Sequence, residues 1–322
     1  MSTYALGIDL GGTSIKGALV EHGVGIMAQC ARPTEGDRGP SHVLDRIAAV
    51  AEELLQTHEG PPPIGLGMGA PGTINLERTT VSHPSNLDGW AVVDVRAAMR
   101  ERLGIEHVVV ENDANIAGLG SAHYGVGTAY DSFLMVTLGT GVGGAIIYNN
   151  QVFRGSTGGA GEIGHMSIDY EGPLDNSGIS GAVEAYLGQQ FLSEHARLRL
   201  RHRPESTVHG LTGNDLSTLT PRILHQAATQ GDEAAVEILA WAGHKLGCVL
   251  SSAVNLLDIR VIIVGGGVSN AGDFLLDPAR ATLRDQVFPG LQEGLRIEQE
   301  HMGNKVGVLG AAHLAFSTQP ES

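Results

Sequence analysis

Short apolar runs that end in glycine alternate with amphipathic segments along this chain. Tyr4–Leu10 and Ile15–Val20 are separated by Gly11, Gly12 and Thr13, which predicts a strand, a tight turn and a second strand. Val24–Ala31 adds a third predicted strand. Strands alternating with helices through both halves of the chain favour an α/β fold.

A helix is predicted over Ser41–His58, because apolar residues recur there at helical spacing, and Ser41 is its expected N-cap. The other predicted strands are Ile64–Met68, His107–Val110, Ser132–Leu138, Ala145–Tyr148 and Arg260–Val264. The other predicted helices are Asp94–Leu103, Asn112–His123, Pro221–Thr229, Glu233–Leu257, Phe274–Gln286 and Leu309–Phe316.

The opening pattern occurs twice. Thr137–Ile147 parallels Asp9–Val20, with a difference of one residue in the length of the glycine loop. An internal duplication explains this similarity, and two ordinary hairpins are the alternative. A length of 322 residues also favours two domains.

Composition and charge narrow the class of protein. Glycine accounts for 46 residues without a Gly-X-Y period, and 42% of residues are hydrophobic, so a packed core is expected rather than collagen or disorder. The net charge of −15 lacks the basic footprint of a nucleic-acid binder. We expect a cytoplasmic protein with no membrane partner, since the chain has no signal-peptide pattern and no apolar run of membrane-spanning length. The two cysteines, Cys30 and Cys248, exclude a disulfide framework.

Three predicted strands end in glycine turns, at Gly11, Gly139 and Gly265. Glycine lets the backbone approach a ligand and direct N–H groups at phosphate oxygens. Asp9, at the end of the first strand, is placed to hold a hydrated cation beside such phosphates, or else to cap the turn. The patterns G-x-x-x-x-G-K-[ST] and strand-to-helix G-x-G-x-x-G are absent.

Two polar segments could carry chemistry. Glu111–Asn115 lies at a strand–helix junction, where Asp113 is a candidate general base and Asn112 or Asp113 a candidate N-cap. Gly161–His165 places Glu162 and His165 three residues apart, with Glu184 beyond, and this set suits a polyhydroxylated substrate or a metal ion.

These segments in this order resemble the ROK family of sugar kinases, within the actin-like ATPase and hexokinase superfamily. The resemblance extends from Tyr4 to Phe316 and rests on Asp9–Gly17, Gly69–Gly72, Asn86–Trp90, Glu111–Asn115, Leu138–Gly144, Gly161–Met166 and Val264–Val268. It implies a two-domain, ribonuclease H-like α/β fold with an interdomain cleft. Residues 1–117 and 303–322 would form the smaller domain and residues 118–302 the larger one.

The resemblance implies an ATP-dependent hexose kinase of carbohydrate metabolism, a homodimer that phosphorylates the 6-hydroxyl of glucose in glycolysis. Asp113 would be the general base. The implied sugar-binding residues are Gly69, Asn86, Asn112, Glu162, His165 and Glu184. The implied nucleotide-binding residues are Asp9 (near Mg²⁺), Gly11, Gly12, Thr13, Lys16, Gly139, Thr140, Gly141, Gly265 and Gly266.

One segment departs from the family pattern. Where the family carries the zinc-binding sequence C-x-C-G-x-x-G-C-x-E, this chain has Asp175, Ser177 and Ala182 at the three cysteine positions. Two hard oxygen donors and a methyl group do not suit zinc, so we expect no zinc and a His165 that contacts the sugar alone.

Three alternatives remain open at this point. The acceptor could be fructose, mannose or an N-acetylated hexosamine, and the donor could be polyphosphate. The family also includes sugar-responsive transcriptional regulators, which carry an N-terminal helix-turn-helix. We expect none here, because the first predicted strand begins at Tyr4.

Overall fold

The computed structural model describes residues 2–84 and 87–318. The chain forms two compact units. Unit 1 comprises Met1–Asp131, Ala145–Gly161 and Asn304–Ser322, and unit 2 comprises Ser132–Gly144 and Glu162–Gly303. The expected boundary between residues 117 and 118 lies inside helix α3 (Asp113–Tyr124), which continues without a break to Tyr124.

Unit 1 is built on a five-stranded sheet with strand order β3-β2-β1-β4-β8. Strands β1, β2 and β3 are antiparallel neighbours, whereas β1, β4 and β8 run parallel. The bounds are β1 (Tyr4–Leu10), β2 (Ser14–Glu21), β3 (Gly25–Pro33), β4 (Leu66–Ala70) and β8 (Val108–Asn112). A small second sheet contains β5 (Thr73–Ile74), β6 (Thr80–Ser82) and β7 (Val92–Asp94).

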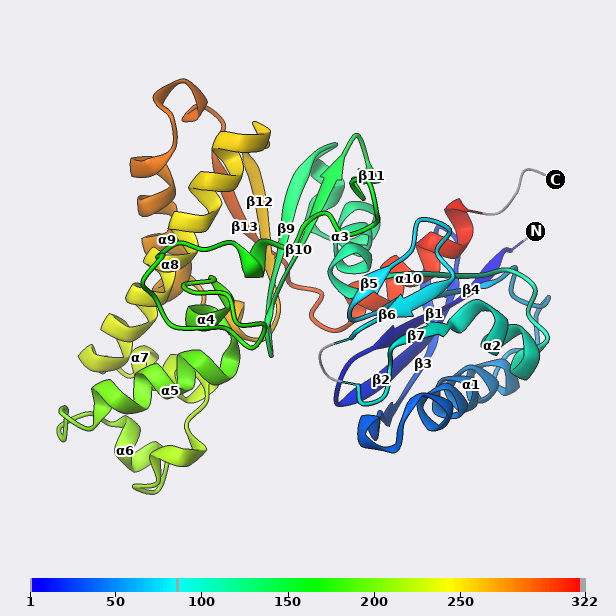
Figure 1. Cartoon of the computed structure of the whole chain (residues 1–322), viewed down its shortest axis with the longest axis horizontal. Coiled ribbons are helices and arrows are strands. Elements are labelled where there is room, and N and C mark those ends of the chain that lie inside the picture. The colour runs from blue at the N-terminus through cyan, green and yellow to red at the C-terminus, as the bar shows by residue number, and fades with distance from the viewer. Residues whose placement is uncertain (1, 85–86, 319–322) are drawn as a thin grey trace. The chain divides into compact units, whose positions relative to one another are not determined.

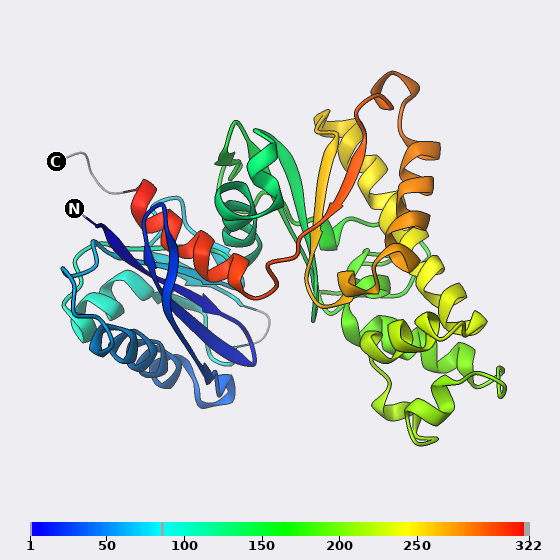
Figure 2. The same ribbon diagram turned by 180° about the vertical axis from the view of Figure 1, so that it is seen from behind.

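Helices cover both faces of the unit 1 sheet (Figures 1 and 2). Helices α1 (Pro40–Gln56) and α2 (Val95–Leu103) lie on one face, and α10 (Lys305–Ser317) lies on the other. The apolar stripe of α1 enters the core, as its spacing predicted. The expected N-cap Ser41 is wrong, because Pro40 occupies the first helical position and Gly39 is the N-cap.

Glycine allows α10 to pack unusually close to its neighbours. A Cβ at Gly7 in β1 or at Gly67 in β4 would overlap backbone carbonyls of α10. A Cβ at Gly310 in α10 would overlap the carbonyl of Ile116 in α3, and one at Gly120 would overlap that of Val306. Part of the glycine excess therefore serves helix packing rather than ligand binding.

The second five-stranded sheet has the order β11-β10-β9-β12-β13. Strands β9, β12 and β13 are parallel, and helices α8 and α9 pack against each other. The strands are β9 (Phe133–Leu138), β10 (Val142–Tyr148), β11 (Gln151–Val152), β12 (Val261–Gly265) and β13 (Arg296–Gln299). The helices are α4 (Glu184–Leu187), α5 (Gln189–Leu200), α6 (Val208–Leu211), α7 (Pro221–Thr229), α8 (Glu233–Leu257) and α9 (Asp273–Gln286).

The two sheets share one topology. In each, a strand–turn–strand–strand unit (β1-β2-β3 or β9-β10-β11) precedes two strands that add, in parallel, on the far side of the first strand. This repeated order supports the internal duplication indicated by the sequence. Within the described residues, no helix is both long enough and apolar enough to span a membrane.

Candidate active site

The parallel strands of unit 1 bring three predicted site segments to one edge of the sheet. Asp9 on β1 pairs in register with Gly69 on β4, and Gly69 pairs with Glu111 on β8. Asp113 follows directly as the first residue of α3. Ligands of open α/β sheets bind beyond the carboxyl ends of such strands.

Asp9 faces Lys16 across the antiparallel pair β1–β2, with 3.6 Å between Oδ2 and Nζ. Burial raises the pKa of Asp9, and Lys16 partly opposes that shift. Lys16 also donates a 3.1 Å hydrogen bond to the Asn304 side chain. A carboxylate oxygen at a strand end, beside a glycine turn, fits Mg²⁺, which proteins hold by one or two carboxylates together with substrate phosphates.

The first glycine turn is held by a residue that sequence reasoning missed. The buried Thr34 donates from Oγ1 to the Gly11 carbonyl at 2.6 Å, and its N–H donates to the Thr13 carbonyl at 2.9 Å. Gly11 closes the turn by donating to the carbonyl of Ser14. No motif marks Thr34, because the contact joins the end of β3 to a turn about twenty residues earlier.

Asn112 caps the helix that begins with Asp113. Its Oδ1 accepts from the N–H groups of Ala114 and Asn115, and its Nδ2 donates to the Gly72 carbonyl at 3.3 Å. The N-cap interpretation of Asn112 is therefore confirmed, and the cap fixes the direction in which α3 leaves the sheet. Only glycine fits at position 69, because a Cβ there would overlap the Ile116 side chain of α3.

Glu111 forms a buried ionic cluster beneath this segment. Its side chain is 0% exposed and lies 3.0 Å from Arg78 Nε and 2.8 Å from Arg154 Nε. Its Oε1 accepts from the backbone N–H of Asn112 and from the Asn115 side chain. Sequence reasoning missed both arginines, which lie far from Glu111 along the chain.

Arg154 extends this cluster to the β5–β6 hairpin. Its guanidinium donates to the carbonyls of Asn75 and Leu76, each at 2.9 Å, and to that of Ile74 at 3.4 Å. The cluster therefore joins the hairpin to the strand end that carries Asn112 and Asp113. Asn86, the expected sugar ligand nearest this hairpin in sequence, lies outside the described residues.

The second glycine turn joins β9 to β10 in unit 2. Gly139 donates to the Gly141 carbonyl at 2.9 Å, and the N–H of Gln189 donates to the Gly139 carbonyl at 3.0 Å. Glu184 accepts from the N–H of Val142 at 2.9 Å, and a Cβ at Gly141 would overlap the Glu184 carboxylate. Glu184, expected to bind sugar, thus also supports the phosphate-type turn.

Glu162, His165 and Glu184, the candidate substrate ligands, lie close enough in unit 2 to influence one another electrostatically. His165 Nε2 lies 4.0 Å from Glu162 Oε2. The pKa of Glu162 lies above its ordinary value. Burial is the main cause and the Glu184 charge adds to it, while His165 partly opposes the shift. A cluster of two carboxylates and an imidazole can hydrogen-bond several hydroxyls of one ligand.

The third glycine turn adjoins a cavity of about 360 Å³ beyond the carboxyl end of β12. Gly266 has φ +88°, and a Cβ there would overlap the Leu138 backbone. The cavity is lined by Gln189, Thr220, Pro221, Arg222, His225, Gly267, Val268, Asn270 and Ala271. Its mixture of apolar walls and polar groups suits a nucleoside, although only the adjoining glycines were expected from the sequence.

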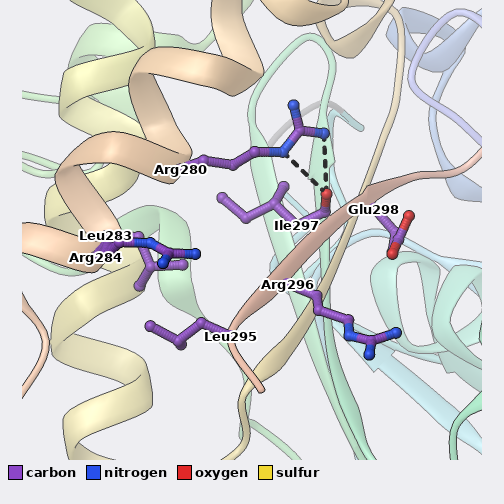
Figure 3. Close-up of a pocket in the computed structure, with 7 residues that line it drawn as sticks. All are labelled: Arg280, Leu283, Arg284, Leu295, Arg296, Ile297 and Glu298. Carbon is purple, nitrogen blue, oxygen red and sulfur yellow. Dashed lines mark hydrogen bonds between the residues drawn. The ribbon is translucent and has the colours of Figure 1, made fainter. Parts of the chain in front are cut away.

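Another cavity, of about 310 Å³, lies where α9 meets β13 (Figure 3). Arg280 there donates to the Ile297 carbonyl and to Asp273 and Asp277. Leu295, Arg296, Ile297 and Glu298 line it, so this cavity runs along the edge strand β13. Ligands of open α/β sheets bind instead beyond the carboxyl ends of the strands.

The residues at the zinc positions of the family do not form a metal site. Within residues 2–84 and 87–318, no three His, Cys, Asp or Glu side chains are grouped to hold a metal ion. Asp175 instead accepts a hydrogen bond from His165, with 2.8 Å between Oδ2 and Nδ1. Ala182 is fully buried and offers no donor atom. This donor set does not fit zinc.

Two five-stranded sheets that repeat one α/β topology, with glycine turns at the carboxyl ends of their strands, define the actin-like class of two-domain folds. The chain belongs to the ROK family, whose family model matches residues 5–318.

Relatives match over almost the whole chain. A glucokinase of Halalkalibacterium halodurans is 32% identical over 97% of this chain and 94% of its own length. A glucokinase of Streptomyces coelicolor is 33% identical over 98% of both chains. The crystal structure of a ROK family glucokinase from Streptomyces griseus, in complex with glucose and AMPPNP, superposes with a TM-score of 0.87. It is 32% identical and covers 98% of this chain and 99% of that one.

Proposed function

We propose that this chain transfers the γ-phosphoryl group of ATP to the 6-hydroxyl of glucose, with Asp113 as the general base. Family membership and full-length similarity to glucokinases identify the enzyme class as an ATP-dependent sugar kinase. The observation that carries the proposal is the carboxyl end of the parallel strands of unit 1, where β1 ends at Asp9 and the first glycine turn, and β8, two strands away, leads into Asp113.

In the proposed reaction, Asp113 accepts the proton of the attacking hydroxyl as its oxygen approaches the γ-phosphorus. An aspartate serves as the base of protein kinases in the same way. The Asn112 cap and the Glu111 cluster fix the backbone on which Asp113 stands. Positioning and charge stabilisation supply most of the catalysis in phosphoryl transfer, so this fixed backbone matters as much as the base.

The phosphates are held by backbone N–H groups of the first two glycine turns, at Gly11–Thr13 and Gly139–Gly141. Asp9 holds Mg²⁺, which neutralises phosphate charge when bound. Lys16, next to Asp9, adds a positive charge at the same strand end. The nucleoside packs on Gly265 and Gly266 and enters the cavity lined by Arg222, His225 and Asn270, which favours ATP over polyphosphate.

The hexose is held by Asn112, Glu162, His165 and Glu184 and by the Gly69 backbone, and Asn86 is a further expected ligand. The clustering of Glu162, His165 and Glu184 supports this assignment, because several acceptors are needed to recognise several hydroxyls.

A panel of sugars and donors tests the proposal. ADP release is measured with glucose, fructose, mannose and N-acetylated hexosamines, and sugar phosphate is measured with ATP or polyphosphate as donor. We expect ATP with glucose to give the highest kcat/KM. A higher kcat/KM with another hexose would show that glucose is not the preferred acceptor, and a higher value with polyphosphate would show that ATP is not the preferred donor. No turnover with any pair would favour a sugar-binding regulator over a kinase.

A further inference from the structure

The loop that follows His165 is organised around one buried carboxylate. The Asp175 side chain is 0% exposed. Its Oδ1 accepts from the backbone N–H groups of Ser177 at 2.9 Å and Ile179 at 2.8 Å. Ser177 Oγ lies 2.7 Å from Oδ1 and 2.9 Å from Oδ2, and His165 Nδ1 lies 2.8 Å from Oδ2. These donors surround both carboxylate oxygens.

This environment keeps Asp175 ionised. Burial alone would raise the pKa of Asp175, but hydrogen bonds from Ile179, Ser177 and His165 outweigh it and hold the pKa below its ordinary value. A buried carboxylate whose oxygens all have donors is a stable structural centre.

The carboxylate also sets the orientation of the His165 ring. Because ionised Asp175 can only accept, the hydrogen of neutral His165 must lie on Nδ1. Nε2 then carries the lone pair on the side of Glu162, 4.0 Å from Oε2. That nitrogen is available to accept a hydrogen bond from a ligand hydroxyl.

The same loop leads to Glu184. Gly181 donates to the Pro173 carbonyl at 2.7 Å and closes the loop. Beyond it, Ser167 pairs with Ala182, and Val183 donates to the Met166 carbonyl at 3.0 Å. Glu184 comes next and supports the second glycine turn through Val142. The Asp175 centre therefore connects two of the proposed sugar ligands.

We infer that Asp175, with Ser177, is a positioning residue that replaces a bound zinc ion by hydrogen bonds and presents His165 Nε2 to the hexose. The inference rests on the proposed hexose kinase activity for its ligand, but not for its geometry. A metal ion holds its ligands by coordination, whereas here the protein supplies both the anchor and the donors.

Two measurements on the unaltered protein test the geometry independently of any activity. In ¹⁵N spectra of the histidine rings, at a pH where His165 is neutral, we expect the Nδ1–H tautomer, assigned by comparison with His165→Gln. Metal analysis of the purified protein should find zinc well below one ion per chain. The Nε2–H tautomer, or stoichiometric zinc, would overturn the inference even if the kinase assignment is correct.

A pair of variants tests the positioning role. Asp175→Ala should raise the KM for the hexose about 10- to 100-fold, the range expected for losing hydrogen bonds to a charged group, with a smaller change in kcat. Its His165 tautomer should become mixed. The control is Asp215→Ala. Asp215 stands in an Asp-x-Ser sequence like that of Asp175 and Ser177, and its Oδ1 accepts from the Ser217 N–H at 2.9 Å. No histidine is among the hydrogen-bond partners of Asp215 in the part of the chain that the structure describes.

The outcomes separate the two proposals. If Asp175→Ala has the hexose KM and the tautomer of the wild type, the positioning role is wrong. If Asp175→Ala fails to fold, the tautomer and zinc measurements on the wild type still decide. If no hexose is phosphorylated by the wild type but the Nδ1–H tautomer is found without zinc, the proposed function fails and the Asp175 centre stands.

Discussion

The Glu111 cluster offers a quantitative test of how the segment that carries Asp113, the proposed base, is held. The change Glu111→Gln keeps the side-chain shape but removes the charge that pairs with Arg78 and Arg154. The side chains of Arg78 and Arg154 are only 23% and 12% exposed, so little water can replace the lost Glu111 carboxylate. Removing one member of a buried ion pair costs roughly 3–5 kcal/mol.

We expect a loss at the lower end of that range, about 3 kcal/mol in the free energy of unfolding. Arg154 moderates the loss because it keeps its hydrogen bonds to the Asn75 and Leu76 carbonyls. The matched control is Glu53→Gln, which breaks the Arg32–Glu53 pair at the same 2.8 Å distance with side chains 42% and 46% exposed. An exposed pair contributes about 1 kcal/mol or less.

Urea unfolding followed by tryptophan fluorescence measures both variants, with the shift in midpoint converted through the slope. The reasoning predicts a clearly lower midpoint for Glu111→Gln than for Glu53→Gln, together with reduced kcat for the first alone. Equal midpoints for the two variants would refute the claim that the buried cluster stabilises this strand end.

Three further predictions follow from other residues. Gly266→Ala should raise the KM for ATP and lower stability by about 1–3 kcal/mol, because φ is +88° and a Cβ would overlap Leu138. The control Gly210→Ala in α6, where a Cβ meets open space and φ is not positive, should neither raise that KM nor lower stability. Burial, and to a smaller extent the neighbouring His123 and His22, lowers the pKa of His313 to about 4. Between about pH 6.5 and 4 the unfolded chain therefore binds a proton that the folded chain does not, and the free energy of unfolding falls as the pH drops through this range. His313→Phe should make that fall shallower in urea midpoints taken across this pH range, and an unchanged slope would contradict the assignment. Asp9→Asn should raise the Mg²⁺ concentration needed for half-maximal turnover, and an unaltered Mg²⁺ titration would remove Asp9 from the metal site.

Local patterns predicted the fold well because each element is encoded by neighbouring residues. Strand β1 and helices α7 and α8 have the predicted bounds, and the α/β class with its repeated strand–turn–strand unit is confirmed. Errors occur where a local signal was overridden or absent. Pro40 displaced Ser41 from the N-cap of α1, and α5 was missed because only Leu192, Ser193, Ala196 and Leu200 of its twelve residues are buried, which leaves a weak apolar pattern.

The supporting shell of the site could not be predicted, since it joins residues far apart in sequence. Thr34 with Gly11, Arg154 with Glu111 and Asp175 with His165 are contacts of the folded chain that leave no periodic pattern in the sequence.

The glycine excess has two physical causes. Some glycines form the turns at strand ends. Others, such as Gly67 and Gly310, let α10 pack directly against the backbone of its neighbours.

The most direct test of the central claim is the turnover of Asp113→Asn with ATP, Mg²⁺ and glucose in a coupled assay. The control is Asp45→Asn, whose exposed carboxylate on α1 pairs with Arg102. We predict that Asp113→Asn lowers kcat by about 10²- to 10⁴-fold, the usual contribution of a general base, while its thermal unfolding and glucose binding match the wild type. A kcat for Asp113→Asn close to that of Asp45→Asn would contradict the proposed mechanism.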